Sequence, residues 1–193
     1  MIPSKINILD IVRGHIRTLC HASNGKLLKY DLFFFYATPA IISIVFCFWK
    51  DCLSSEVTNA LIAVFSIFSG LLLNLLVLLI GIISKARNDF DKYLKILNDD
   101  TNTISALEQR NAKADSDKSE IKLKLLKETY YNLSYAVVIS ICTLASLLIC
   151  YTSENSIRIL GTTVAVYLTI NFALTLFMIL KRIHIILKDE FLN

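Results

Sequence analysis

Apolar and charged residues occupy separate, long blocks along this chain. Four windows contain no Asp, Glu, Lys or Arg, and they cover residues 32–49, 57–84, 129–153 and 159–180. Their lengths are 18, 28, 25 and 22 residues, whereas a bilayer core of ~30 Å needs about 20 apolar residues in a helix. Backbone groups inside a bilayer must pair within their own segment. The pattern therefore predicts an all-α fold, a four-helix transmembrane bundle.

The Lys and Arg residues predict how the bundle is oriented. Eighteen of the 20 lie in three segments, residues 1–31, 85–128 and 181–193. Only Lys50 and Arg158 lie in the short loops at about 50–56 and 154–158. Basic residues mark the cytoplasmic side, so we expect a multi-pass membrane protein with both ends in the cytoplasm.

This topology divides the chain into five parts. They are a cytoplasmic amphipathic segment (1–31), a first transmembrane hairpin (32–84), a cytoplasmic helical hairpin (85–128), a second transmembrane hairpin (129–180) and a cytoplasmic tail (181–193). Residues 85–128 hold ten basic and nine acidic side chains, interleaved. Such mixed charge is typical of a solvated helix surface, so no direct nucleic-acid partner is expected.

The N-terminal segment shows helical periodicity over residues 4–21. One stripe of that helix is apolar, formed by Ile8, Leu9, Val12, Ile16 and Leu19. Two locations remain open for it. The helix could lie on the inner leaflet, with Lys26 and Lys29 near anionic lipid headgroups, or it could pack on the cytoplasmic part of the same protein.

The central segment is predicted to form a hairpin of two helical arms that turns near residues 111–116. Apolar residues recur at helical spacing on both arms. A disordered linker is the alternative. We expect the hairpin to be the docking site for a cytosolic partner, because the outer loops are too small for a standard interface. The candidate partner-binding residues are Phe90, Tyr93, Leu94, Leu97, Ile121, Leu123 and Leu125. The rival interpretation is that they only hold the two arms together.

Polar residues recur at one depth in the membrane windows. Ser43, Asn74, Ser140 and Asn171 each lie about ten residues from the inner end of their helix, or ~15 Å deep. This intramembrane polar layer is expected to consist of interhelical hydrogen bonds that hold the bundle together. A cavity lining or a seam between subunits is the alternative.

The sequence offers little catalytic chemistry. The windows contain no charged residue, and His15, His21 and His184 lie outside them, which argues against a proton-coupled pump. No nucleotide-binding, zinc-protease or serine-hydrolase motif is present. Cys52 and Cys150 are expected near the outer surface, where they could pair or remain free thiols. We expect no enzyme activity, no metal and no cofactor.

The layout of a basic amphipathic start, four membrane helices and a long cytoplasmic centre resembles the KwaA family, the membrane subunit of the bacterial Kiwa anti-phage defence system. The features that carry it are residues 32–49, 57–84 and 85–128, and no diagnostic motif is among them. The resemblance implies a homo-oligomer, expected to be a tetramer, that binds a cytosolic effector of the KwaB kind.

Two functions of different classes follow from this reading. The first is an inner-membrane sensor or scaffold in anti-phage defence, which oligomerises, contacts membrane lipids and recruits a cytosolic effector subunit. The second is an oligomeric pore-forming effector that depolarises the cell, with the polar layer facing a central path. A small channel or a lipid-handling enzyme is a more distant third.

Overall fold

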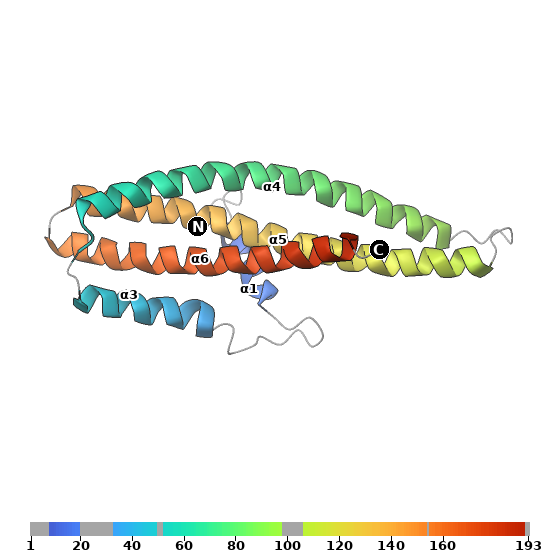
Figure 1. Cartoon of the computed structure of the whole chain (residues 1–193), viewed down its shortest axis with the longest axis horizontal. Coiled ribbons are helices and arrows are strands. Elements are labelled where there is room, and N and C mark those ends of the chain that lie inside the picture. Colours follow the sequence, from blue (N-terminus) through green and yellow to red (C-terminus); the bar gives the residue numbers. More distant parts are fainter. Residues whose placement is uncertain (1–7, 20–32, 50–51, 98–105, 154, 192–193) are drawn as a thin grey trace.

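The computed structural model describes residues 8–19, 33–49, 52–97, 106–153 and 155–191 of the chain (Figure 1). These residues are all-α and contain no strand, which confirms the predicted class. The elements are α1 (Ile8–Thr18), the short π-helix η1 (Phe33–Ala37), α3 (Thr38–Trp49), α4 (Ser55–Leu97), α5 (Ala106–Thr152) and α6 (Asn155–Phe191).

Three helices, α4, α5 and α6, are long and apolar enough to cross a membrane. Their apolar windows match three of the four windows seen in the sequence. The first window forms the shorter unit η1–α3, which covers Phe33–Trp49. At 1.5 Å per residue its 17 residues measure ~25 Å, slightly less than a bilayer core.

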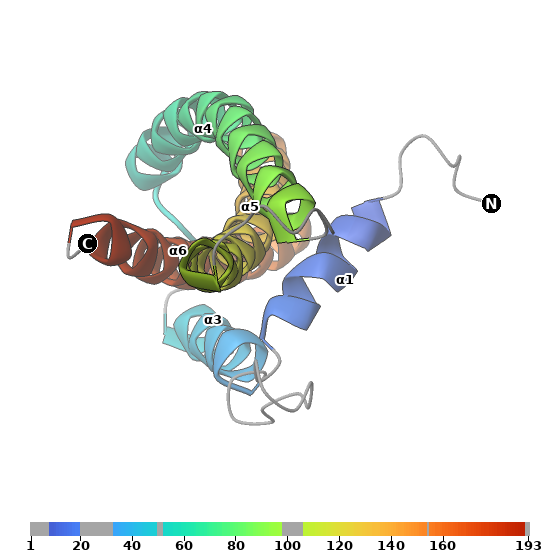
Figure 2. The same ribbon diagram turned by 90° about the vertical axis from the view of Figure 1, so that its right-hand side faces the viewer.

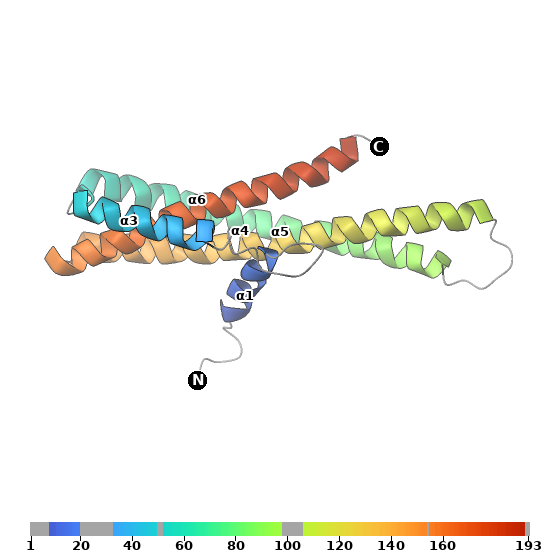
Figure 3. The same cartoon turned by 90° about the horizontal axis from the view of Figure 1, so that it is seen from below.

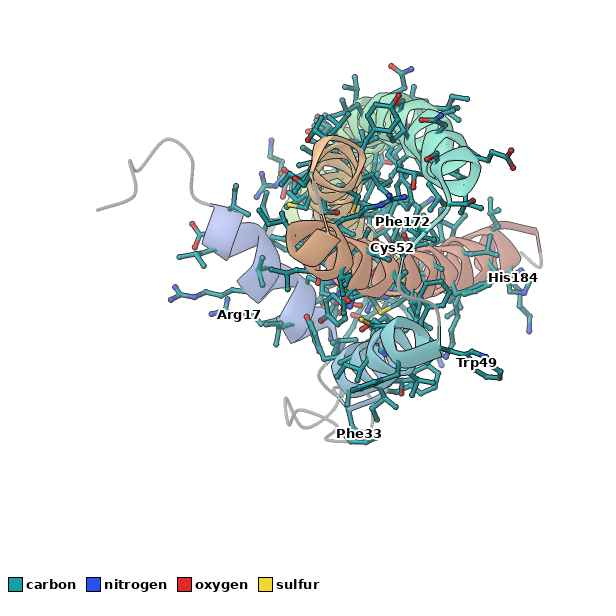
Figure 4. The ribbon with its side chains drawn as sticks, turned by 90° about the vertical axis from the view of Figure 1, so that its left-hand side faces the viewer. Arg17, Phe33, Trp49, Cys52, Phe172 and His184 are labelled. Carbon is teal, nitrogen blue, oxygen red and sulfur yellow. The ribbon has the colours of Figure 1, made fainter. Side chains whose placement is uncertain are left out.

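The long helices form three layers (Figure 1). The pair α5–α6 lies in the middle, α4 covers one side of it, and α3 packs on α6 from the other side (Figure 2). Helix α1 crosses α5 obliquely near its middle, and the ends of α4 and α5 project together beyond the rest of the bundle (Figure 3). Seen end-on, Phe172 lies inside the bundle, whereas Trp49 and His184 lie on its outside (Figure 4).

Helices α4 and α5 pack through a seven-residue repeat. The buried residues of α4 are spaced by seven without exception: Thr58, Phe65, Leu72, Leu79 and Ala86. On α5 the buried series Leu126, Leu133, Ser140 and Leu147 has the same spacing. A heptad repeat keeps two helices in contact as they supercoil. The series runs from the apolar part of α4 to the start of its polar arm, so the apolar and polar parts share one continuous seam.

Small residues allow the closest approaches between helices. A Cβ added to Gly161 of α6 would lie 2.7 Å from Sγ of Cys150 on α5. Ser69 of α4 donates to the hydroxyl of Ser140 on α5 at 2.9 Å. By contrast, a Cβ added to Gly70 would have no neighbour within 4 Å, so this glycine allows no close approach.

The predicted position of the hairpin turn is wrong. Residues 111–116 lie inside α5, which already begins at Ala106. Half of this stretch consists of good helix formers, Ala112, Lys113 and Ala114, which favour helix over turn. Helix α4 ends at Leu97, so the connection between the arms falls in residues 98–105, outside the described residues.

Candidate functional site

The most unusual feature of the chain is a buried polar junction where α1, η1, α5 and α6 meet. Its first element is the crossing of α1 over α5. Gly14 of α1 is buried against the ring of Tyr131, and a Cβ at this position would overlap that ring. Glycine therefore lets the two helix backbones approach closely, and the next residue of α1, His15, is brought into the bundle.

His15 is completely buried, with 0% of its surface exposed. Its imidazole stacks on the ring of Tyr135, with centroids 3.8 Å apart and planes inclined by 12°. The ring of Phe35 meets it edge-on at 6.3 Å. Nδ1 lies 2.9 Å from Oδ1 of Asn132 and donates to that oxygen.

Asn132 links α5 to the end of α1. Its Oδ1 lies 2.8 Å from the hydroxyl of Thr18, which also lies 2.6 Å from the carbonyl oxygen of His15. Asn132 is 0% exposed. Its Oδ1 takes part in both contacts with α1, whereas its Nδ2 is buried and has no partner in the described structure. The oxygen of this side chain therefore helps to specify where α1 docks.

Burial lowers the pKa of His15 from 6.5 to about 4. The hydrogen bond to Asn132 opposes this shift, while the positive charge of Arg182 adds to it. Nε2 has no hydrogen-bond partner in the described structure. The imidazole is therefore neutral at physiological pH, with its single proton on Nδ1.

A second set of bonds fixes η1 to α6. Asn171 is 1% exposed; its Nδ2 donates to the carbonyl oxygen of Phe35 at 3.0 Å, and its Oδ1 accepts from the hydroxyl of Tyr135 at 3.3 Å. Pro39, four residues after Phe35, has no N–H to complete the α-helical bond to that carbonyl. The proline thus accounts for the π-turn, and Asn171 serves the carbonyl that it leaves available.

Arg182 closes the junction at the end of the uncharged window of α6. Its Nη2 donates to the carbonyl oxygen of Thr18 at 2.9 Å and lies 3.4 Å from Oε2 of Glu128. The guanidinium therefore joins α6 to the end of α1 and to α5. Its other terminal nitrogen, Nη1, is buried and unbonded among the described residues.

Two grooves flank the junction. One of about 740 Å³ lies between α1, α4 and α5, and both basic and acidic side chains line it, among them Arg13, Arg17, Lys124, Glu120 and Glu128. The other, of about 490 Å³, lies between the end of α1, η1, α5 and α6. It is mainly apolar and carries two cations, Lys181 and Arg182.

The structure separates the four residues of the predicted polar layer. Ser43 is buried and donates to the carbonyl oxygen of Ala40 in its own helix. Ser140 is buried and bonds Ser69. Asn171 belongs to the junction, whereas Asn74 is exposed on the outer face of α4, and no described residue bonds its amide. Three of the four are therefore buried inside the bundle, and each has different hydrogen-bond partners.

The candidate partner-binding residues also differ in how far they are buried. Leu123 is 7% exposed and belongs to the seam between the arms. The partly buried ones are Phe90, Tyr93, Leu94, Leu97 and Leu125. Ile121 is 59% exposed and is the one residue of this set that presents most of its side chain outward.

The junction itself could not be assembled from the sequence, although one signal was present. His15 lies three residues after Val12 and four before Leu19, so it shares the apolar stripe of α1. A polar residue on such a stripe indicates a buried partner. Nothing in the sequence indicated that the partner would be Asn132, because the two are 117 positions apart.

The described residues hold no obvious reactive centre. Cys47, Cys52, Cys142 and Cys150 are free thiols. No group of three or more His, Cys, Asp or Glu side chains suited to a metal occurs in the described part of the chain. His184 is exposed on α6, and His21 lies outside the described residues. Compared with protein-family models, curated proteins and solved structures, the chain shows no match to any of them.

Proposed function

We propose that this chain is a sensor or scaffold of the bacterial inner membrane that recruits a cytosolic effector in anti-phage defence. In this proposal it crosses the bilayer four times, keeps both ends in the cytoplasm and assembles with copies of itself. Support for a fourth crossing comes from η1–α3, which lies along α6. Arg158, near the start of α6, also donates to the carbonyl oxygen of Leu53 at 3.1 Å and so joins α6 to the connection between α3 and α4.

The observation that carries the proposal is the continuous seam between α4 and α5. Buried positions at seven-residue spacing extend from Thr58 to Ala86, and Phe90 continues the packing into the polar arm. A packed pair of helices that leaves the membrane unbroken can present one defined surface to a protein in the cytoplasm. A linker between two separate membrane hairpins could not do this.

The docking surface is expected to be centred on Ile121. This isoleucine is 59% exposed, and the neighbouring positions on its helix face, Asp117, Lys118 and Lys124, are exposed and charged. An apolar centre with a polar rim is the usual composition of a protein interface. Leu123 is unsuitable as a contact, because it is buried in the seam.

The test is recruitment of a cytosolic protein, measured by its co-purification with the tagged full chain from bacterial cells. We expect Ile121→Arg to reduce its co-purification at least tenfold while membrane insertion and yield stay unchanged. Leu187→Arg is the matched control, because Leu187 is a 44% exposed apolar residue on the tail end of α6. If Ile121→Arg recruits at wild-type strength and Leu187→Arg does not, the docking surface is the tail and not the arm.

The burial of three residues of the polar layer favours a scaffold over a pore. Ser43, Ser140 and Asn171 are buried within the chain and have hydrogen bonds there. A side chain that is bonded inside one bundle does not line a path between several copies.

A further inference from the structure

We propose that the groove between η1, α5 and α6 binds an anionic phospholipid of the membrane leaflet that faces Lys181 and Arg182. The inference requires only that α6 lies in a membrane. It does not depend on the proposed role in defence or on a protein partner.

The lining of the groove follows the order of groups in a phospholipid. Along α6 the lining residues Leu174, Phe177 and Met178 precede Lys181 and Arg182. The apolar residues belong to the uncharged window 159–180, and the two cations follow directly after it. Acyl chains against the first three side chains would place the phosphate at the level of the two cations.

The aromatic residues support the same orientation. Phe177 is 68% exposed and Phe34, on η1, is 53% exposed, and both line this groove. The volume of about 490 Å³ accommodates a headgroup and the first part of the acyl chains, the rest of which would lie in the bilayer.

The charge of the groove fits one phosphodiester. Lys181 and Arg182 both line it, while Glu128, the only carboxylate within ion-pairing distance of Arg182 among the described residues, does not. The ammonium of Lys181 and the guanidinium of Arg182 are both cationic donors, and cationic donors form charge-assisted hydrogen bonds with phosphate oxygens.

The site can be tested with a tryptophan placed in the groove. In the full chain carrying Trp49→Phe, the substitution Phe177→Trp adds a single reporter next to Lys181. The protein is reconstituted in vesicles in which either phosphatidylglycerol or phosphatidylethanolamine carries brominated acyl chains, at equal mole fractions. We expect brominated phosphatidylglycerol to quench the tryptophan more strongly than brominated phosphatidylethanolamine. The difference should correspond to an about five-fold enrichment of phosphatidylglycerol among the lipids that contact the tryptophan.

Two controls make the result specific. Leu160→Trp reports from the same helix at 67% exposure, outside the groove, and should show no preference between the two lipids. Lys181→Gln in the Phe177→Trp background should remove most of the preference, while Lys188→Gln, outside the groove, should keep it. Equal quenching by both lipids at Phe177→Trp, or a preference that Lys181→Gln leaves unchanged, would overturn the proposal.

Arg182→Gln gives a second measurement that allows for a role of this residue in folding. It is expected to lose the lipid preference and also to loosen α1, because the guanidinium bonds the carbonyl oxygen of Thr18. If Arg182→Gln unfolds the chain, Lys181→Gln alone still tests whether the groove prefers the anionic lipid. Lys181 is exposed and makes no bond that holds α1, so its substitution should not affect folding.

Discussion

The imidazole of His15 lies flat on the phenol ring of Tyr135, with centroids 3.8 Å apart. His15 belongs to the N-terminal helix and Tyr135 to the central helix of the bundle, so this stack is the point at which α1 is held. Because the imidazole is neutral and wholly buried, the attachment of α1 depends on its protonation state.

Acidification is expected to release α1. Since burial lowers the pKa of His15 to about 4 in the folded protein against 6.5 when exposed, the docked state excludes a proton that the undocked state accepts. Above pH 6.5 the neutral imidazole favours the docked state of α1 in full. As the pH falls from 6.5 to about 4, the free energy of docking weakens by ~3 kcal/mol in total. Hydrogen exchange of the α1 amides, measured between pH 7.5 and 4.5 and corrected for intrinsic rates, should rise over this window.

The control for acidification is His15→Phe, which keeps an aromatic ring on Tyr135 but cannot take up a proton. Its α1 protection should not change with pH over the same window. If the variant loses protection with acid as strongly as the wild type, another group is responsible and the role assigned to His15 is wrong.

Enlarging Gly14 should separate α1 from α5. A Cβ here overlaps the ring of Tyr131, and forcing such overlap costs ~1–3 kcal/mol. Alanine in place of glycine would otherwise favour the helix by ~1 kcal/mol, so a lower melting temperature for Gly14→Ala would identify the clash. The double variant Gly14→Ala, Tyr131→Ala removes the ring and should recover α1 protection; failure to recover would argue against this contact.

The two membrane asparagines should behave differently. Asn171→Leu leaves the hydroxyl of Tyr135 and the carbonyl of Phe35 without their partner, so we expect the single chain to lose ~1–2 kcal/mol in stability. Asn74→Leu removes no bond within the described chain and should leave thermal stability in dilute detergent unchanged. If copies associate through the outer face of α4, it should instead reduce the oligomer fraction in cross-linking. Equal loss of stability in both variants would contradict this division.

Labelling of single cysteines tests the proposed topology. In a cysteine-free background, Lys113→Cys on the α5 arm should resist an impermeant maleimide added to intact cells, because the arm faces the cytoplasm. Ser55→Cys, at the start of α4, should react. Both positions are exposed in the chain, so burial would not explain a difference between them. The reverse pattern would place the arms outside the cytoplasm.

Much of the fold could be read from the sequence, because charge is excluded from a bilayer core. That rule located α4, α5 and α6 directly and placed η1–α3 in the shortest window. The seam was harder to see. Within residues 57–84 nearly every position is apolar, so a heptad such as Phe65, Leu72 and Leu79 does not stand out from its lipid-facing neighbours.

The polar junction was harder to predict from sequence patterns than the helices or the seam. His15, Asn132 and Asn171 come from three helices, and hydrogen bonds over such separations leave no periodic trace. Proline chemistry could have suggested that the carbonyl of Phe35 needed a partner, since Pro39 cannot supply one. The partner itself follows only from how α3 and α6 pack. The position of Asn74 along its apolar window predicted contacts with other helices, yet its side chain is exposed on the surface of the bundle.

The unbroken seam has a mechanical consequence. From residue 106 to residue 128, α5 extends ~35 Å beyond its apolar window at 1.5 Å per residue. If α4 and α5 tilt together as one rod, a change of about 10° in the bilayer would move the far end of the arms sideways by ~6 Å, about one helical pitch. Membrane thinning or stretching could thus be magnified into a displacement that a bound protein would register, with neither short outer loop touching a ligand.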